Sequence, residues 1–136
     1  MSTRRSTGIQ EVVRVPVTWS ISREDRFVLV ALDGEVQAKD IQEFMSAMVT
    51  EGALSYRKMF DARYVVPGGL RLSDFKAFAG TVVAMAKDTP VGPLAIVIGS
   101  DMDRELAAAY GKADAGRALA IFSDLAEAQQ WLDSPA

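Results

Sequence analysis

The feature that most constrains the fold is the alternation of strand-like apolar runs with segments of helical apolar spacing. Two of the runs, residues 27–32 and 94–98, consist of apolar residues alone, which is typical of strands covered on both faces. Between the runs, apolar residues recur three and four positions apart, which indicates helices. Strands that alternate with helices favour a mostly parallel sheet with right-handed crossovers. The sequence therefore predicts an α/β fold.

The order of elements follows from these patterns. Strands are predicted over residues 12–21, 27–32, 56–63, 94–98 and 118–122, and helices over about 38–51, 73–89, 103–110 and 124–132. Pro16 marks the first strand as a sheet edge, and the short turn 22–26 predicts a hairpin with an antiparallel first strand. We expect Ser73 and Ser123 to cap their helices. The result is β-β-α-β-α-β-α-β-α, a mixed five-stranded sheet in a single domain, 10–136, after a flexible leader, 1–9.

Composition excludes several kinds of function. The net charge of −3 argues against binding of nucleic acid, which favours basic domains. The chain contains no cysteine and no histidine, so thiolate sites and the commonest general base are absent. No apolar stretch is long enough to span a bilayer, and residues 1–8 lack the apolar region of a signal peptide. We expect a cytoplasmic protein.

Five features together resemble the SpoIIAA-like, or STAS-like, proteins of bacteria. These are the antiparallel first strand, the segment Leu32-Asp33-Gly34-Glu35, the strand end Phe60-Asp61, the run 95–97 and the terminal Ala128-Gln129-Gln130-Trp131-Leu132. The similarity covers residues 13–132 and implies a sheet wound with helices, related to the CRAL-TRIO lipid-transfer domains. It also implies either binding of a partner kinase or binding of an apolar ligand.

The resemblance makes Ser73 the candidate phosphorylation switch. In that family a serine at the start of the second helix, in an Asp-Ser-Ser-Gly type of motif, is phosphorylated. Here the region reads Gly68-Gly69-Leu70-Arg71-Leu72-Ser73-Asp74, and Ser73 is the one serine in it. A phosphate there would be favoured by the helix dipole, and the alternative role of Ser73 is a plain N-cap.

Polar residues also gather where the parallel strands are expected to end. In open α/β sheets ligands bind at this edge, so a cleft there could hold a ligand, a partner or a divalent cation. Turns and caps use the same residue types, and the chain has neither a nucleophile motif nor a phosphate-binding loop. We therefore predict no catalytic residue, metal or cofactor, and rank a metal-dependent enzyme last. The edge residues are Asp33, Glu35, Asp61, Arg63, Ser100 and Asp101, with Asp103 beside them.

The two apolar strands 27–32 and 94–98 are expected to be buried on both faces of the sheet, and helices on one face would leave the other face exposed to solvent. A homodimer or a small apolar pocket would supply it. Arg57 and Lys58 are expected on the solvated surface, and Trp19 and Trp131 at the ends of the core. The sequence favours a non-catalytic STAS-like domain that binds a protein partner in bacterial regulation. The alternative is a carrier or sensor of a small apolar or lipid ligand.

Overall fold

The computed structural model describes residues 15–66, 68–99, 108 and 117–134 of the 136-residue chain. The leader 1–9 and most of the helix expected over 103–110 lie outside this part. The described elements are β1 (Val17–Ser22), β2 (Phe27–Gly34), α1 (Ala38–Thr50), β3 (Arg57–Val65), α2 (Leu72–Ala86), β4 (Leu94–Ile98), β5 (Leu119–Phe122) and α4 (Leu125–Asp133).

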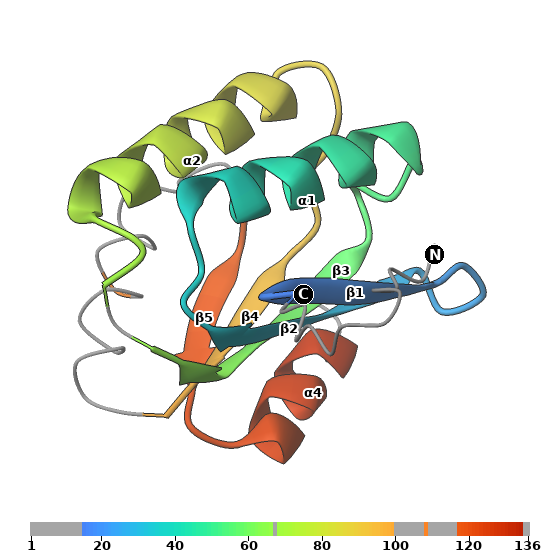
Figure 1. The fold of residues 1–136 in the computed structure, drawn as a ribbon. Helices are drawn as coiled ribbons and strands as arrows, with labels where there is room; N and C mark the ends of the chain where they lie inside the picture. Colours follow the sequence, from blue (N-terminus) through green and yellow to red (C-terminus); the bar gives the residue numbers. More distant parts are fainter. Residues whose placement is uncertain (1–14, 67, 100–107, 109–116, 135–136) are drawn as a thin grey trace, which may run out of the picture.

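The five strands form one sheet in the order β1-β2-β3-β4-β5. β1 is antiparallel to β2, and every other neighbouring pair is parallel. This confirms the predicted fold class and the antiparallel edge strand. A chain that adds parallel strands in one direction through right-handed crossovers places its crossover helices on one face. Figure 1 shows this arrangement, with α1 and α2 together on one side of the sheet and α4 on the other.

Both crossover helices begin with the same backbone-to-aspartate contact. The N–H of Gln37 donates to Asp40 at 2.8 Å, and the N–H of Arg71 donates to Asp74 at 2.8 Å. The prediction that Ser73 caps α2 is therefore wrong, because Ser73 lies within the first turn. Ser123 is not the cap of α4 either, since the Asp124 carboxylate accepts from the N–H of Ala126 at 2.7 Å. A carboxylate forms a stronger, charge-assisted bond than a hydroxyl does.

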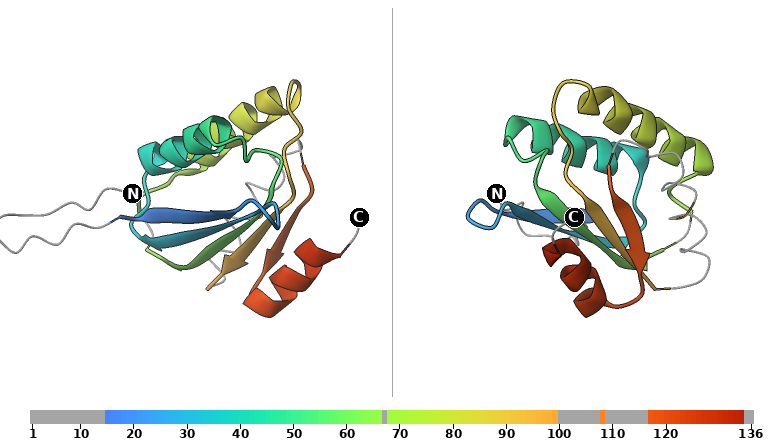
Figure 2. Two further views of the ribbon diagram at one scale, coloured as in Figure 1. Left: turned by 90° about the vertical axis from the view of Figure 1, so that its right-hand side faces the viewer. Right: turned by 180° about the vertical axis from the view of Figure 1, so that it is seen from behind.

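Two apolar clusters hold the layers together. The larger one joins the sheet to α1 and α2 and includes Val28, Val30, Phe44, Phe78 and Ile96. The smaller one lies between α4 and the strands β3 and β4. Its buried members are Met59, Ala95, Val97, Ala128 and Leu132. The described residues thus form a three-layer arrangement, in which α4 is the short helix of the third layer (Figure 2).

The third layer covers only part of the sheet. α4 packs against β3, β4 and β5, and no other helix among the described residues lies over β1 and β2 on that face. All five residues of β4 are buried, as predicted. The same prediction for residues 27–32 is wrong: burial alternates along β2, Val30 is fully buried and Leu29 is 41% exposed. An apolar run does not specify which of its faces a neighbour will cover.

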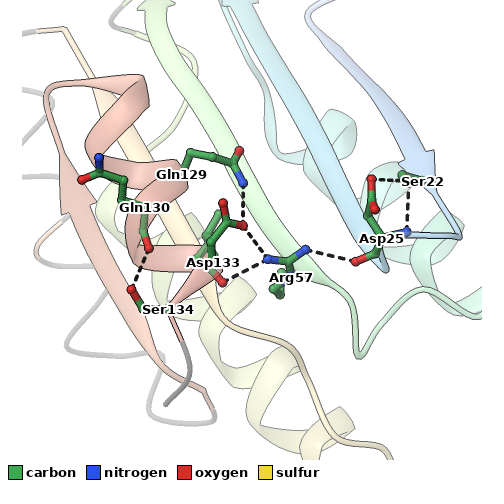
Figure 3. A network of polar contacts seen from close by, with 8 residues as sticks. Ser22, Asp25, Arg57, Gln129, Gln130, Asp133 and Ser134 are labelled. Atoms are coloured by element: carbon green, nitrogen blue, oxygen red, sulfur yellow. Dashed lines mark hydrogen bonds and ion pairs between the residues drawn. The ribbon is translucent and has the colours of Figure 1, made fainter.

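Arg57, at the start of β3, ties α4 to the β1–β2 turn (Figure 3). Its guanidinium donates to the Asp133 carboxylate at 2.8 Å and to the carbonyl of Leu132 at 3.1 Å, both at the end of α4. It also donates to the carbonyl of Asp25 at 3.0 Å, in the turn. The planar guanidinium can make these bonds in several directions at once. Arg57 therefore has a structural role.

Candidate functional site

A cavity of about 140 Å³ lies between the sheet and the helices α1 and α2. We call it the α1–α2 cavity. Among the described residues that line it, all are apolar except two cations, Lys58 and Arg117. The lining comes from the sheet (Leu32, Lys58, Phe60, Ala62, Val65, Leu94, Ile96, Ile98), α1 (Ile41, Phe44, Met45), α2 (Phe75, Phe78, Val82, Met85) and the adjoining segments (Leu54, Leu70, Val91, Arg117).

The strand register places the two cations at the same end of the sheet. Lys58 pairs with Leu94, and Leu94 pairs with Leu119, at the amino ends of β3, β4 and β5. Arg117 precedes Leu119 by two residues. Phe60 and Ile96 pair further along the same strands, followed by Ala62 and Ile98. The α1–α2 cavity therefore has a cationic end and an apolar body.

Lys58 is buried to 2% exposure, and among the described residues it is the one buried polar or charged side chain. Its ammonium donates to the carbonyl of Leu54 at 2.6 Å and to the carbonyl of Tyr56 at 2.8 Å. An ammonium has three donors, and among the described residues two of them have acceptors. Within the described part of the chain, no carboxylate forms an ion pair with Lys58. The expectation that Lys58 is a solvated surface residue is wrong.

The surroundings of Lys58 disfavour its charge. Burial, together with a smaller effect of the positive charge of Arg117, lowers the pKa of Lys58 from 10.5 to about 7. Desolvation penalises a charged amine, and a neighbouring like charge acts in the same direction. At neutral pH, Lys58 is therefore divided between its neutral and its protonated form.

The backbone around Lys58 is held in place by Gly92. The N–H of Gly92 donates to the carbonyl of Leu54 at 3.0 Å, the same carbonyl that accepts from Lys58. A Cβ atom on Gly92 would lie 2.1 Å from the carbonyl oxygen of Tyr56, so a side chain cannot fit there. The two carbonyls that bind the ammonium are thus fixed by close backbone packing.

Of the predicted edge residues, the structure describes Asp33, Glu35, Asp61 and Arg63. Asp61 and Arg63 lie on β3, next to each other on the face that carries Met59, and pair at 2.9 Å. Hydrogen bonds from Arg63 hold the pKa of Asp61 below its usual value. Asp33 and Glu35 are exposed at the end of β2. Ser100, Asp101 and Asp103 lie outside the described residues.

Ser73 and the glycine pair before it lie at the carboxyl ends of the strands, away from the cations. Ser73 is exposed in the first turn of α2. Gly68 has a positive φ of 116°, and a Cβ on Gly69 would lie 2.1 Å from the carbonyl oxygen of Val36. The two glycines are therefore needed for the turn and its close approach to the end of β2.

Sequence reasoning missed Lys58, although a signal for it was present. Met59 and Phe60 are adjacent and both apolar, so each face of β3 is covered at this point. Because side chains alternate along a strand, Lys58 shares the face of Phe60 and Ala62. That face is the one under α1 and α2.

Comparisons of the chain with protein-family models, with curated proteins and with solved structures gave no match. In the described ranges, no helix combines the length and the apolar character needed to cross a membrane. No group of three or more Asp or Glu side chains within those ranges is arranged to hold a metal ion. The α1–α2 cavity is therefore the candidate functional site.

Proposed function

We propose that this protein is a non-catalytic carrier or sensor that binds a small apolar molecule in the α1–α2 cavity. The observation that carries the proposal is an apolar cavity of about 140 Å³. A cavity of about 150 Å³ lined by Leu, Ile and Phe is known to bind benzene. The body of the ligand is therefore a ring or a short chain of about six carbon atoms. A long acyl chain exceeds this volume.

The residues that line the cavity favour a ligand-binding site over a void left by imperfect packing. Close-packed interiors contain few voids larger than a water molecule, and an empty cavity destabilises a fold. Here Phe44 from α1, Phe78 from α2 and Ile96 from β4 face the same space. The order of elements and the antiparallel edge strand also support the proposed kinship with STAS-like and CRAL-TRIO domains, for which binding of an apolar ligand is one expectation.

Toluene binding to two matched variants tests the proposal. Ala62→Leu adds bulk inside the cavity. Ala31→Leu adds the same bulk outside it, because Ala31 pairs with Asp61 and these two side chains lie on the face of the sheet opposite to Ala62. We expect toluene to bind the wild-type protein and Ala31→Leu, and to bind Ala62→Leu at least roughly tenfold more weakly because the space is filled. Chemical shifts of the methyl groups of Leu32, Val82 and Ile96 report the binding. Equal affinity in both variants, or no binding to wild type, would refute the proposal.

Binding of a protein partner is the second candidate function, and the exposed face of β2 favours it. Leu29 is 41% exposed, and Ala31 is exposed beside it. Both lie on the same face of the sheet as α4, but on β2, whereas α4 packs against β3, β4 and β5. Exposed apolar side chains that cluster are found at interaction sites. Leu29→Thr should weaken retention of a specific partner from a lysate of the native host, and unchanged retention would count against this face. Ser73 is exposed, so the phosphorylation switch stays a prediction that mass spectrometry can check.

A further inference from the structure

One end of the α1–α2 cavity differs chemically from the rest. Among the lining residues that the structure describes, Lys58 and Arg117 are the two with ionisable side chains, and both are basic. The described lining residues from α2 and β4, among them Phe78, Val82, Met85 and Leu94, are apolar. A ligand without a charge would use the body of this cavity and leave the cationic end unused.

The ammonium of Lys58 has three donors, and among the described residues two of them have acceptors. These two donors are directed to the carbonyls of Leu54 and Tyr56, at 2.6 and 2.8 Å. These carbonyls orient the ammonium but do not neutralise it. A buried ammonium without a counter-ion is costly, and a bound anion removes that cost and gains a charge-assisted hydrogen bond. Arg117 adds positive charge beside it.

We propose that the α1–α2 cavity selects small apolar carboxylic acids, with the carboxylate against Lys58 and the hydrocarbon among Phe44, Phe78 and Ile96. This inference rests on the proposed function and names the class of its ligand. The volume limits the hydrocarbon to about six carbon atoms, as in hexanoate or benzoate.

Binding of such an acid is coupled to a proton. The pKa of Lys58 is about 7 in the free protein, and a bound carboxylate raises it because an opposite charge favours the protonated form. At about pH 8 most of the free protein has a neutral Lys58, so each carboxylate that binds takes up close to one proton. An uncharged ligand of the same shape takes up none.

Hexanoate and 1-hexanol form the matched probe pair, because they share the alkyl chain and differ in charge. At about pH 6.5 we expect hexanoate to bind wild type at least roughly tenfold more tightly than 1-hexanol. Lys58→Met should lose this preference for hexanoate but should still bind 1-hexanol. Binding of 1-hexanol also shows that the variant is folded. Lys76→Met, at an exposed position on α2, is the control and should behave as wild type.

Isothermal titration calorimetry in two buffers of different ionisation enthalpy measures the proton. At about pH 8 the wild type should take up close to one proton with hexanoate and none with 1-hexanol. If neither probe binds, the proposed function itself fails. If 1-hexanol binds but hexanoate binds no more tightly, or if Lys58→Met keeps the preference for hexanoate, only the assignment of the carboxylate is overturned.

Discussion

At the scale of single residues, Lys58 makes the stability of the free protein depend on pH. Its pKa is about 7 in the folded protein and 10.5 in the unfolded chain. Below about pH 7 both states hold the proton, and the folded state bears the full cost of the buried charge. Between these two values the unfolded chain binds more protons than the folded protein, so stability rises with pH.

The first prediction concerns how steeply the free energy of unfolding rises with pH. Lys58 should raise the free energy of unfolding by up to about 1.4 kcal/mol per pH unit above about pH 7. Lys58→Met removes the titrating group, so its stability relative to wild type should be greatest at low pH and should decline toward about pH 10. Urea denaturation of wild type, Lys58→Met and the control Lys76→Met across this range measures the difference. Parallel curves for wild type and Lys58→Met would contradict the prediction.

At the scale of elements, α4 is held by polar contacts as well as by an apolar cluster. It is nine residues long, buries Ala128 and Leu132, and is joined to the sheet by Arg57. Short helices are only marginally stable in isolation, so their stability depends on tertiary contacts. The cover that α4 gives to β3, β4 and β5 therefore depends on this contact.

The second prediction is that Arg57→Met loosens α4. Hydrogen bonds from a charged group contribute about 1.5–3 kcal/mol each when buried, and the partial exposure of this site reduces the expected loss to about 1–2 kcal/mol. Amide exchange should accelerate in α4 and stay unchanged in α1. The control is Arg23→Met, which removes an exposed ion pair with Glu51 and should change stability by less than about 1 kcal/mol. Equal losses in both variants would show that Arg57 has no special role.

At the scale of the whole molecule, the layers are unequal. α1 and α2 cover one face of the sheet, and α4 covers the β3–β5 part of the other. Neighbouring residues on β2 therefore have opposite environments: Val30 is fully buried, whereas Leu29 is 41% exposed. In Figure 2 the edge of the sheet formed by β1 and β2 extends away from α4.

The third prediction uses this difference. Val30→Thr places a hydroxyl in the core without changing the shape of the side chain, and should cost about 1–3 kcal/mol. Leu29→Thr faces solvent and should cost less than about 1 kcal/mol. Chemical denaturation of the two variants measures both values. Similar large losses would mean that the second face of β2 is covered, for instance by a second subunit, which sedimentation would reveal.

Residues 38–51 and 94–98 show what was predictable, because helical spacing and an apolar strand run are local patterns. The structure places a helix at Ala38–Thr50 and a strand at Leu94–Ile98. The first strand begins at Val17 within the described residues, although alternation suggested a start at residue 12. The sequence analysis assigns the caps to Ser73 and Ser123, but the adjacent Asp74 and Asp124 accept the hydrogen bonds because a carboxylate is a better acceptor than a hydroxyl.

The sequence by itself determined the order of the elements, the antiparallel edge strand and the mostly parallel sheet, because these depend on periodicity and on the handedness of crossovers. Only the tertiary structure decided that Lys58 is buried, that Leu29 is exposed and that a cavity lies between the sheet and the helices α1 and α2. Burial depends on which distant segment packs against a face. That information is shared among residues far apart in the chain and is not contained in any one stretch.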